Sequence, residues 1–162
     1  MQSKKYYGPK PIIYEDAKTY YDSPEYPVNS SNEQAFVPGG MLLAWLIKRD
    51  LISRYFKKEN QNFIKDFQQG KISGPKIYKS WGGRLTSFML NFKGNQFLEY
   101  YLQEGPVNYF KDYEKYLLKG LDNIFEISDT QQNYKIAESF LDQRFKEWQR
   151  KTRKWWEFWK LF

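Results

Sequence analysis

The chain has 162 residues and a formal net charge of +7, with 20% aromatic residues, no cysteine and no histidine. This length supports one domain with a good core, and the aromatic content is far above that of a disordered chain. The missing residue types exclude disulfides, zinc sites built on cysteine, and catalytic arrangements that depend on histidine or cysteine. We therefore expect no catalytic, cofactor or metal site.

Residues 1–11 predict an irregular arm, because Gly8, Pro9 and Pro11 interrupt any regular pattern. Residues 14–21 predict a short helix, which the prolines that follow would end. Within residues 33–50, apolar side chains recur at helical spacing and predict a helix from about Pro38. Its front half is apolar on nearly all sides, which indicates a central, buried helix. The Gly39-Gly40 pair is interpreted as a tight helix entry, since a phosphate cradle needs more glycines.

Residues 60–69 predict the next helix, and Gly70 suits the position just after its end. A short helix is expected to begin at Ser73-Gly74-Pro75, and the glycines at 82 and 83 would stop it. Residues 86–103 then predict a longer helix, in which Gly94 indicates either a kink or a close contact.

Residues 109–118 predict another helix, and Gly120 follows it. Residues 121–128 (LDNIFEIS) are the one convincing strand-like segment. We therefore expect an all-α fold, a mainly helical single domain with at most one short strand or hairpin near residues 121–128.

Asp129 or Thr130 can cap a last helix that runs from about Gln131 toward the end of the chain. One apolar stripe follows it in steps of three and four residues, which is the helical period. Its members are Tyr134, Ala137, Leu141, Phe145, Trp148, Thr152, Trp155, Trp159 and Phe162. We expect Phe145 and Trp148 in the core, whereas the later members pack either on the domain or on a partner.

Residues 144–162 hold four of the six tryptophans, and their seven Lys/Arg against two Asp/Glu give a net charge of +5. So many large aromatic side chains exceed what a solvated surface carries. We therefore predict a partner-binding surface made of Arg150, Arg153, Lys154, Trp155, Trp156 and Trp159. A protein groove, an anionic membrane surface and nucleic acid all suit such a helix. Nucleic acid is disfavoured, because residues 1–143 are nearly neutral and carry no known binding motif.

Two groups of charged residues have structural interpretations. Glu15 and Asp16 are adjacent, so they cannot share a helix face for acid–base work, and we expect a solvated or capping pair. Asp142, Arg144 and Glu147 lie on the last helix, where we expect them to form ion pairs to neighbouring helices.

Six segments in this order resemble a family of small, uncharacterised bacterial cytoplasmic proteins. They are YEDAKTYY (14–21), VPGGMLLAWLIKRDLIS (37–53), FIKDFQQGKIS (63–73), LNFKGNQFLEYYL (90–102), KDYEKYL (111–117) and NYKIAESFLDQRFKEWQ (133–149). The family often has a Trp and a His after the first acidic pair, where this chain has Thr19, Tyr20 and Tyr21. The resemblance gives residues 12–149 as the domain and 150–162 as an extension of its last helix.

Many genes of that family lie beside polymorphic or secretion-system toxins. The resemblance therefore implies an immunity protein that neutralises a cognate interbacterial toxin, such as a type VI secretion effector, by direct binding and active-site occlusion. A peripheral module that docks its basic aromatic helix on anionic membrane or nucleic acid is the alternative. The N-terminus has no apolar segment of a secretory signal, so we expect a cytoplasmic protein.

Overall fold

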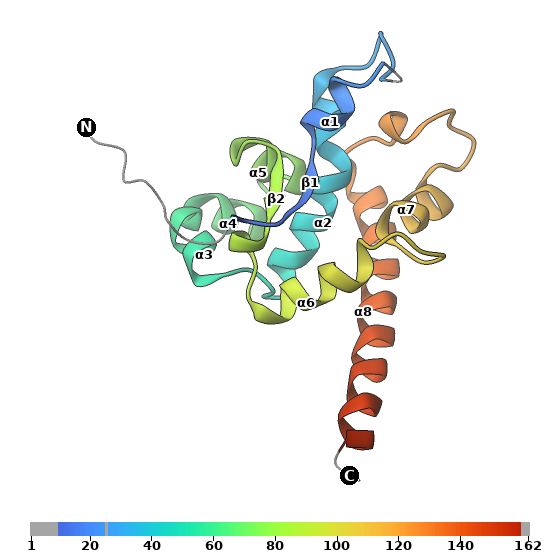
Figure 1. Cartoon of the computed structure of the whole chain (residues 1–162). Coiled ribbons are helices and arrows are strands. Elements are labelled where there is room, and N and C mark those ends of the chain that lie inside the picture. Colours follow the sequence, from blue (N-terminus) through green and yellow to red (C-terminus); the bar gives the residue numbers. More distant parts are fainter. Residues whose placement is uncertain (1–9, 25, 160–162) are drawn as a thin grey trace.

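The computed structural model describes residues 10–24 and 26–159, with side chains up to Arg153. Helices predominate in it (Figure 1). The α-helices are α1 (Lys18–Tyr21), α2 (Val37–Lys48), α3 (Arg54–Glu59), α4 (Gln61–Gln68), α5 (Gly74–Ser80), α6 (Phe92–Tyr101), α7 (Tyr109–Leu117) and α8 (Gln131–Trp159). Three 3₁₀ turns, η1 (Asn32–Phe36), η2 (Ser87–Met89) and η3 (Ile124–Glu126), and two strands, β1 (Ile13–Asp16) and β2 (Arg84–Thr86), complete the described part. The expectation of a mainly helical single domain is confirmed.

Helix α2 forms the centre of the domain, as its apolar front half predicts. Every residue from Val37 to Ile47 is buried. Helices α5, α6 and α8 surround it, and α7 packs on the opposite side of α8 (Figure 1). The side chains of Trp45, Phe97 and Phe145 meet between α2, α6 and α8, with ring centroids 5.0–5.4 Å apart. A helix buried on all sides in this way fixes the positions of its neighbours.

Helices α2 and α5 cross at a contact that only glycine allows. A Cβ atom on Gly74 would lie 2.5 Å from the Cβ of Ala44, and one on Gly40 would lie 2.5 Å from the backbone nitrogen of Pro75. Real Cβ atoms do not approach other atoms so closely. Gly40 therefore lies in the first turns of α2 because α5 packs there, and its role goes beyond a tight helix entry.

The two strands lie where the sequence does not predict them. β1 pairs antiparallel with β2, with Ile13 opposite Thr86, so the front half of the expected helix over 14–21 is extended. The expected strand over 121–128 is wrong. The side chain of Asn123 accepts a hydrogen bond from the Phe125 N–H and starts the 3₁₀ turn η3 there. Both errors concern short segments whose conformation depends on local caps or on distant partners.

The long helix expected over 86–103 begins only at Phe92. Before it, the Asn91 N–H donates to the Leu51 carbonyl, and the Asn91 side chain accepts from the Gly94 N–H as a cap. A Cβ on Gly94 would overlap the Leu51 carbonyl oxygen. Of the two alternatives for this glycine, close contact is therefore correct.

The helices expected over 60–69, from 73 to about 81, over 109–118 and from 131 are confirmed as α4, α5, α7 and α8. Helix α3 was not predicted. Gly70 has φ +70°, and α4 ends in a Schellman motif, with Gly70 N–H donating to Phe67 O and Lys71 N–H to Asp66 O. Among the described helices, none is sufficiently long and apolar to cross a membrane.

Candidate functional site

Helix α8 carries all six residues predicted to bind a partner, and it starts at a defined cap. The Thr130 hydroxyl accepts a hydrogen bond from the Asn133 N–H at 3.2 Å. From there the predicted stripe runs along the core. Ala137 and Leu141 are fully buried, and Trp148 is 7% exposed. The rings of Phe145 and Trp148 stack at 5.5 Å, and Trp148 also reaches Phe97 at 5.6 Å. Trp148 belongs to the core as expected, whereas Phe145 is half-buried and packs against it.

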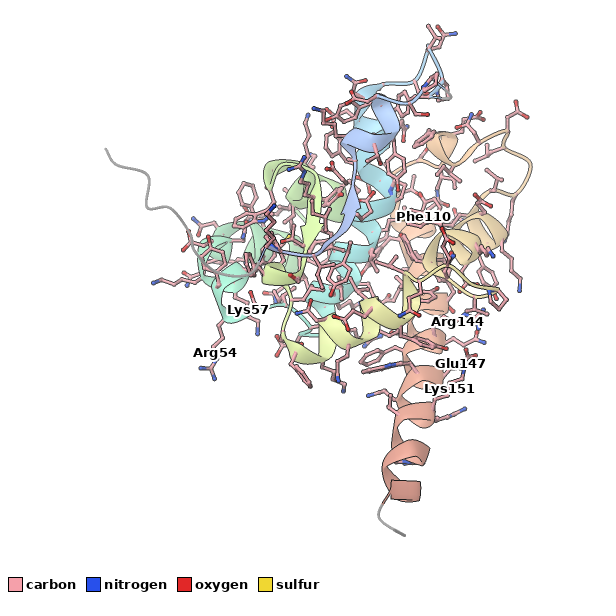
Figure 2. The ribbon with its side chains drawn as sticks, in the orientation of Figure 1. Arg54, Lys57, Phe110, Arg144, Glu147 and Lys151 are labelled. Atoms are coloured by element: carbon pink, nitrogen blue, oxygen red, sulfur yellow. The ribbon has the colours of Figure 1, made fainter. Side chains whose placement is uncertain are left out.

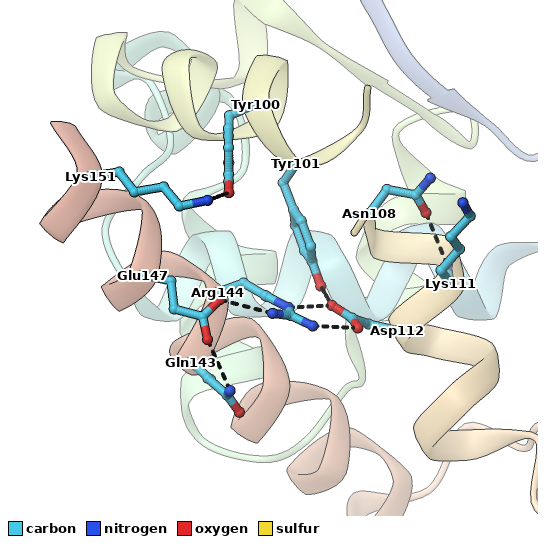
Figure 3. A network of polar contacts seen from close by, with 9 residues as sticks. All are labelled: Tyr100, Tyr101, Asn108, Lys111, Asp112, Gln143, Arg144, Glu147 and Lys151. Carbon is cyan, nitrogen blue, oxygen red and sulfur yellow. Dashed lines mark hydrogen bonds and ion pairs between the residues drawn. The ribbon is translucent and has the colours of Figure 1, made fainter. Parts of the chain in front are cut away.

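A polar network fixes α8 against α7 and α6 (Figure 3). The Arg144 guanidinium donates to both oxygens of the Asp112 carboxylate, at 2.7 and 3.0 Å, and the Tyr101 hydroxyl donates to the same carboxylate at 2.6 Å. Burial alone would raise the pKa of Asp112, but these hydrogen bonds and the Arg144 charge hold it below its ordinary value. On its other side Arg144 donates to Glu147, which also accepts from Gln143. The pair between Arg144 and Glu147 is therefore within α8.

A second network joins α8 to the C-terminal end of α2. The Asp142 carboxylate accepts hydrogen bonds from the Trp45 indole N–H at 2.9 Å and from Arg49 Nε at 2.8 Å. One turn earlier, Glu138 pairs with Lys48 at 2.6 Å. The expected interhelical ion pairs are thus confirmed for Asp142 and for Arg144. Acting from two sides, these networks fix the rotation of α8 about its own axis.

Lys151 links α8 to α6, and it lies on the surface. Its ammonium donates to the Tyr100 hydroxyl of α6 at 3.0 Å and lies 5.4 Å from the centre of that ring. Beyond Lys151 the ribbon of α8 continues away from the rest of the domain (Figure 2). The end of α8 therefore projects from the body that holds its first half.

The predicted partner-binding residues fall on this projecting end. Arg150 and Arg153 are exposed. The backbone at positions 154, 155, 156 and 159 is helical, but the side chains of Lys154, Trp155, Trp156 and Trp159 lie outside the described residues. The partner-binding surface over these six residues thus stays a prediction, now on a continuous helix.

Glu15 and Asp16 point to opposite faces of β1, as adjacent strand residues do. Asp16 pairs with Arg84 of β2 at 2.6 Å. Glu15 is 4% exposed and lies against the first turn of α2, where a Cβ on Gly39 would collide with its carboxylate. No hydrogen bond of normal geometry reaches either Glu15 oxygen. The interpretation of this pair as solvated or capping is wrong for Glu15.

Burial raises the pKa of Glu15 to about 8; the neighbouring Asp16 adds to the rise, and the nearby Tyr20 hydroxyl opposes it. The hydroxyls of Tyr78 and Tyr113 are likewise buried without a partner. Among the described residues, no group of three or more acidic, histidine or cysteine side chains could hold a metal ion.

The sequence did not reveal that Arg144 pairs with Asp112 or that Tyr101 donates to the same carboxylate. Asp112 lies 32 positions before Arg144, on a different helix, and carries no motif of its own. The available signal was Arg144 itself, a charged residue on a helix that otherwise packs through apolar side chains. A charged residue on a buried face needs a partner of opposite charge.

Comparison with known proteins assigns a family to most of the chain. No curated protein and no solved structure matches the chain. A family model described as "Domain of unknown function (DUF7832)" matches residues 13–127, which run from β1 through η3 and stop just before α8. Because this match covers more than half of the chain, the protein belongs to the DUF7832 family.

Proposed function

We propose that this protein is a non-catalytic binding protein whose projecting helix end, residues 150–159, docks on a partner protein. The observation that carries the proposal is the continuation of α8 beyond the domain after Lys151 (Figure 2). A sequence this rich in large aromatic side chains is rarely left solvated, so a partner protein is the natural cover for it. The sequence of this end, rich in tryptophan, lysine and arginine, has the composition of interface hot spots.

The firm attachment of α8 supports this use. Two side-chain networks and the stack of Phe145 on Trp148 hold the first half of the helix in one orientation. The second half is therefore presented in a fixed direction, which lowers the entropy lost on binding. Its positive charge suits an acidic partner surface and would speed association.

We further propose that the partner is a protein toxin, which this chain would inhibit in the cytoplasm by covering the active site. The support for this part of the proposal is the resemblance of six sequence segments to immunity-like proteins. The natural candidate is the product of a neighbouring gene with a variable C-terminal domain.

The test is co-expression of the full chain with that toxin, followed by gel filtration. We expect protection of the cells and a stable complex. The triple variant Trp155→Ala, Trp156→Ala and Trp159→Ala should lose both, whereas Phe92→Ala, which removes a 78% exposed aromatic from α6, should keep both. A toxin that still kills and forms no complex would contradict the toxin proposal.

The membrane alternative has its own readout. The full chain and the triple variant are each floated with vesicles of phosphatidylserine and phosphatidylcholine. This experiment distinguishes docking on a protein from docking on a membrane. Protein docking predicts no flotation of either. Flotation of the wild type alone would replace the protein partner by a membrane surface.

A further inference from the structure

A cavity among the described residues lies at the opposite end of α8 from the projecting helix. It has a volume of about 710 Å³ and lies between α2, the turn after α4, the start of α5 and the start of α8. Ligand cavities in proteins typically enclose roughly 300–1,000 Å³. The cavity is therefore large enough for a small organic molecule, and none of the interactions proposed for the C-terminal end uses it.

Its walls are apolar on one side. Met41 and Ile47 of α2, Phe67 of α4, Pro75 of α5 and Tyr134 of α8 line it. The Phe67 and Tyr134 rings meet edge to face at 6.4 Å, so they form one continuous aromatic wall. Such a wall suits the flat or aliphatic body of a ligand.

The rim of the cavity is cationic. Its charged residues are Lys48, Lys71 and Lys76 against Asp129, so three positive charges face one negative charge. Asp129 is engaged by the Ser73 hydroxyl, and Lys48 is held by Glu138 at 2.6 Å. Two ammonium groups therefore remain for a ligand.

Those two ammonium groups have weak or no competing partners. Lys71 faces Asp66 at 3.6 Å in a pair whose side chains are 63% and 43% exposed, and exposed pairs contribute little. Lys76 forms no ion pair among the described residues. A ligand with a negative group can therefore recruit both lysines without breaking a strong interaction.

The backbone keeps Lys71 at the rim. The Schellman motif at the end of α4 fixes Gly70 and Lys71 through hydrogen bonds to Phe67 and Asp66. Only a few residues later, α5 is fixed against α2 by the close approach of Gly74 to Gly40. The segment between them thus has little freedom, and the first turn of α8, at Thr130 and Gln131, adds a partial positive charge on the far side.

From this combination we propose that the cavity binds a small organic anion with an apolar body, such as an aromatic or aliphatic phosphate or carboxylate. The apolar wall takes the body, and Lys71 and Lys76 pair with the anionic group. The proposal is independent of any partner at the end of α8.

The test is an NMR titration of the full ¹⁵N-labelled chain with phenyl phosphate at pH 7. We expect saturable shifts of the amides of residues 70–76 and 129–134. Benzyl alcohol supplies the apolar body alone and inorganic phosphate supplies the charge alone, and both should bind at least tenfold more weakly.

A charge-reversal variant identifies the cationic groups. The double variant Lys71→Glu and Lys76→Glu should weaken phenyl phosphate binding at least tenfold. Its control, Lys58→Glu with Lys119→Glu, makes the same change of net charge at exposed positions away from the cavity and should bind like the wild type. An unchanged amide spectrum outside the cavity shows that each variant is folded.

Three results would overturn the proposal. The first is the absence of saturable shifts at the cavity. The second is equal affinity for benzyl alcohol or inorganic phosphate, and the third is equal weakening by the control variant, which would mean unspecific attraction to the charged protein.

Discussion

Arg144 and Asp112 meet edge to edge, with Nε 2.7 Å from Oδ2 and Nη2 3.0 Å from Oδ1. The Asp112 side chain is 5% exposed and that of Arg144 is 16% exposed, so both charges are largely removed from water (Figure 3). A bidentate pair of this kind is strong because both donors point at one planar acceptor. It joins the last helix to α7 within the core.

Loss of one member of this pair should strongly destabilise the fold. Arg144→Met leaves the Asp112 charge buried with only the Tyr101 hydroxyl, and we expect a loss of about 3–5 kcal/mol in the free energy of unfolding. Urea unfolding followed by circular dichroism measures it. The control Lys146→Met removes an exposed positive charge from the same helix and should change stability by less than about 0.5 kcal/mol. A small effect of Arg144→Met would mean that the Asp112 carboxyl becomes neutral or regains water once the guanidinium is gone.

The crossing of α2 and α5 predicts a severe effect of a single methyl group. Gly74→Ala places a Cβ against Ala44 and the Gly40 carbonyl, so the helices must separate, and we expect a destabilisation of at least about 2 kcal/mol. Gly105→Ala is the control, because a Cβ there has no neighbour within 4 Å. Thermal unfolding of both variants checks this. Equal melting temperatures would show that α5 can move without loss.

Glu15 predicts a stability that falls as pH rises. Its pKa is about 8 in the folded state against an ordinary value of 4.5, so the folded protein binds more protons between these two values. The contribution is complete below pH 4.5 and is lost as pH rises through about 8, with a slope of up to about 1.4 kcal/mol per pH unit. Urea unfolding at several pH values measures it.

The variant Glu15→Gln isolates this group, because the amide has similar shape and no charge. It should flatten the pH dependence and make the protein more stable than wild type at pH 9. Asp112 does not interfere, since its pKa is lowered and its contribution is lost only in acid, as pH falls through that lowered value. An unchanged slope in Glu15→Gln would assign the dependence to other groups.

Removal of residues 150–162 should leave the domain folded. Among the residues whose side chains are described, Trp148 is the last core residue of α8, and the later contact of Lys151 with Tyr100 is exposed. We expect a melting temperature within a few degrees of the full chain and an unchanged near-UV spectrum. By contrast, Trp148→Ala should cost about 3–5 kcal/mol. A truncated chain that unfolds would place the final tryptophans in the core.

Local patterns predicted those parts of the fold whose information lies within one helix. The apolar surround of α2 and the stripe of α8 follow from spacing alone, and Thr130 follows from capping chemistry. The pairing of Ile13 with Thr86 joins residues far apart in the sequence. The segment around Tyr14 taken alone therefore predicts a helix, because its extended conformation depends on strand β2. Periodicity cannot show such a contact.

The same reason explains what was missed at the sites. Arg144 pairs with Asp112 on α7, whose carboxylate also accepts from Tyr101 on α6. The lysines that line the cavity come together only when α2, α5 and α8 pack around it. Glu15 can be buried only because Gly39 has no Cβ. The Gly39-Gly40 pair in the sequence does not by itself predict this contact. The continuation of α8 to Trp159, in contrast, was predicted from the helical spacing of its stripe.

Because α8 is one continuous helix, the side-chain positions in its first half determine the directions in which the residues of its second half point. Each residue of an α-helix turns the chain by about 100° and advances it about 1.5 Å. One residue inserted after Trp148 would therefore swing everything beyond it by about 100°, with the core undisturbed. Seven inserted residues would bring that face back to within about 20° of its original direction, about 10 Å farther from the domain. The direction in which the projecting end faces therefore depends on the number of residues between it and Trp148, as much as on which residues these are.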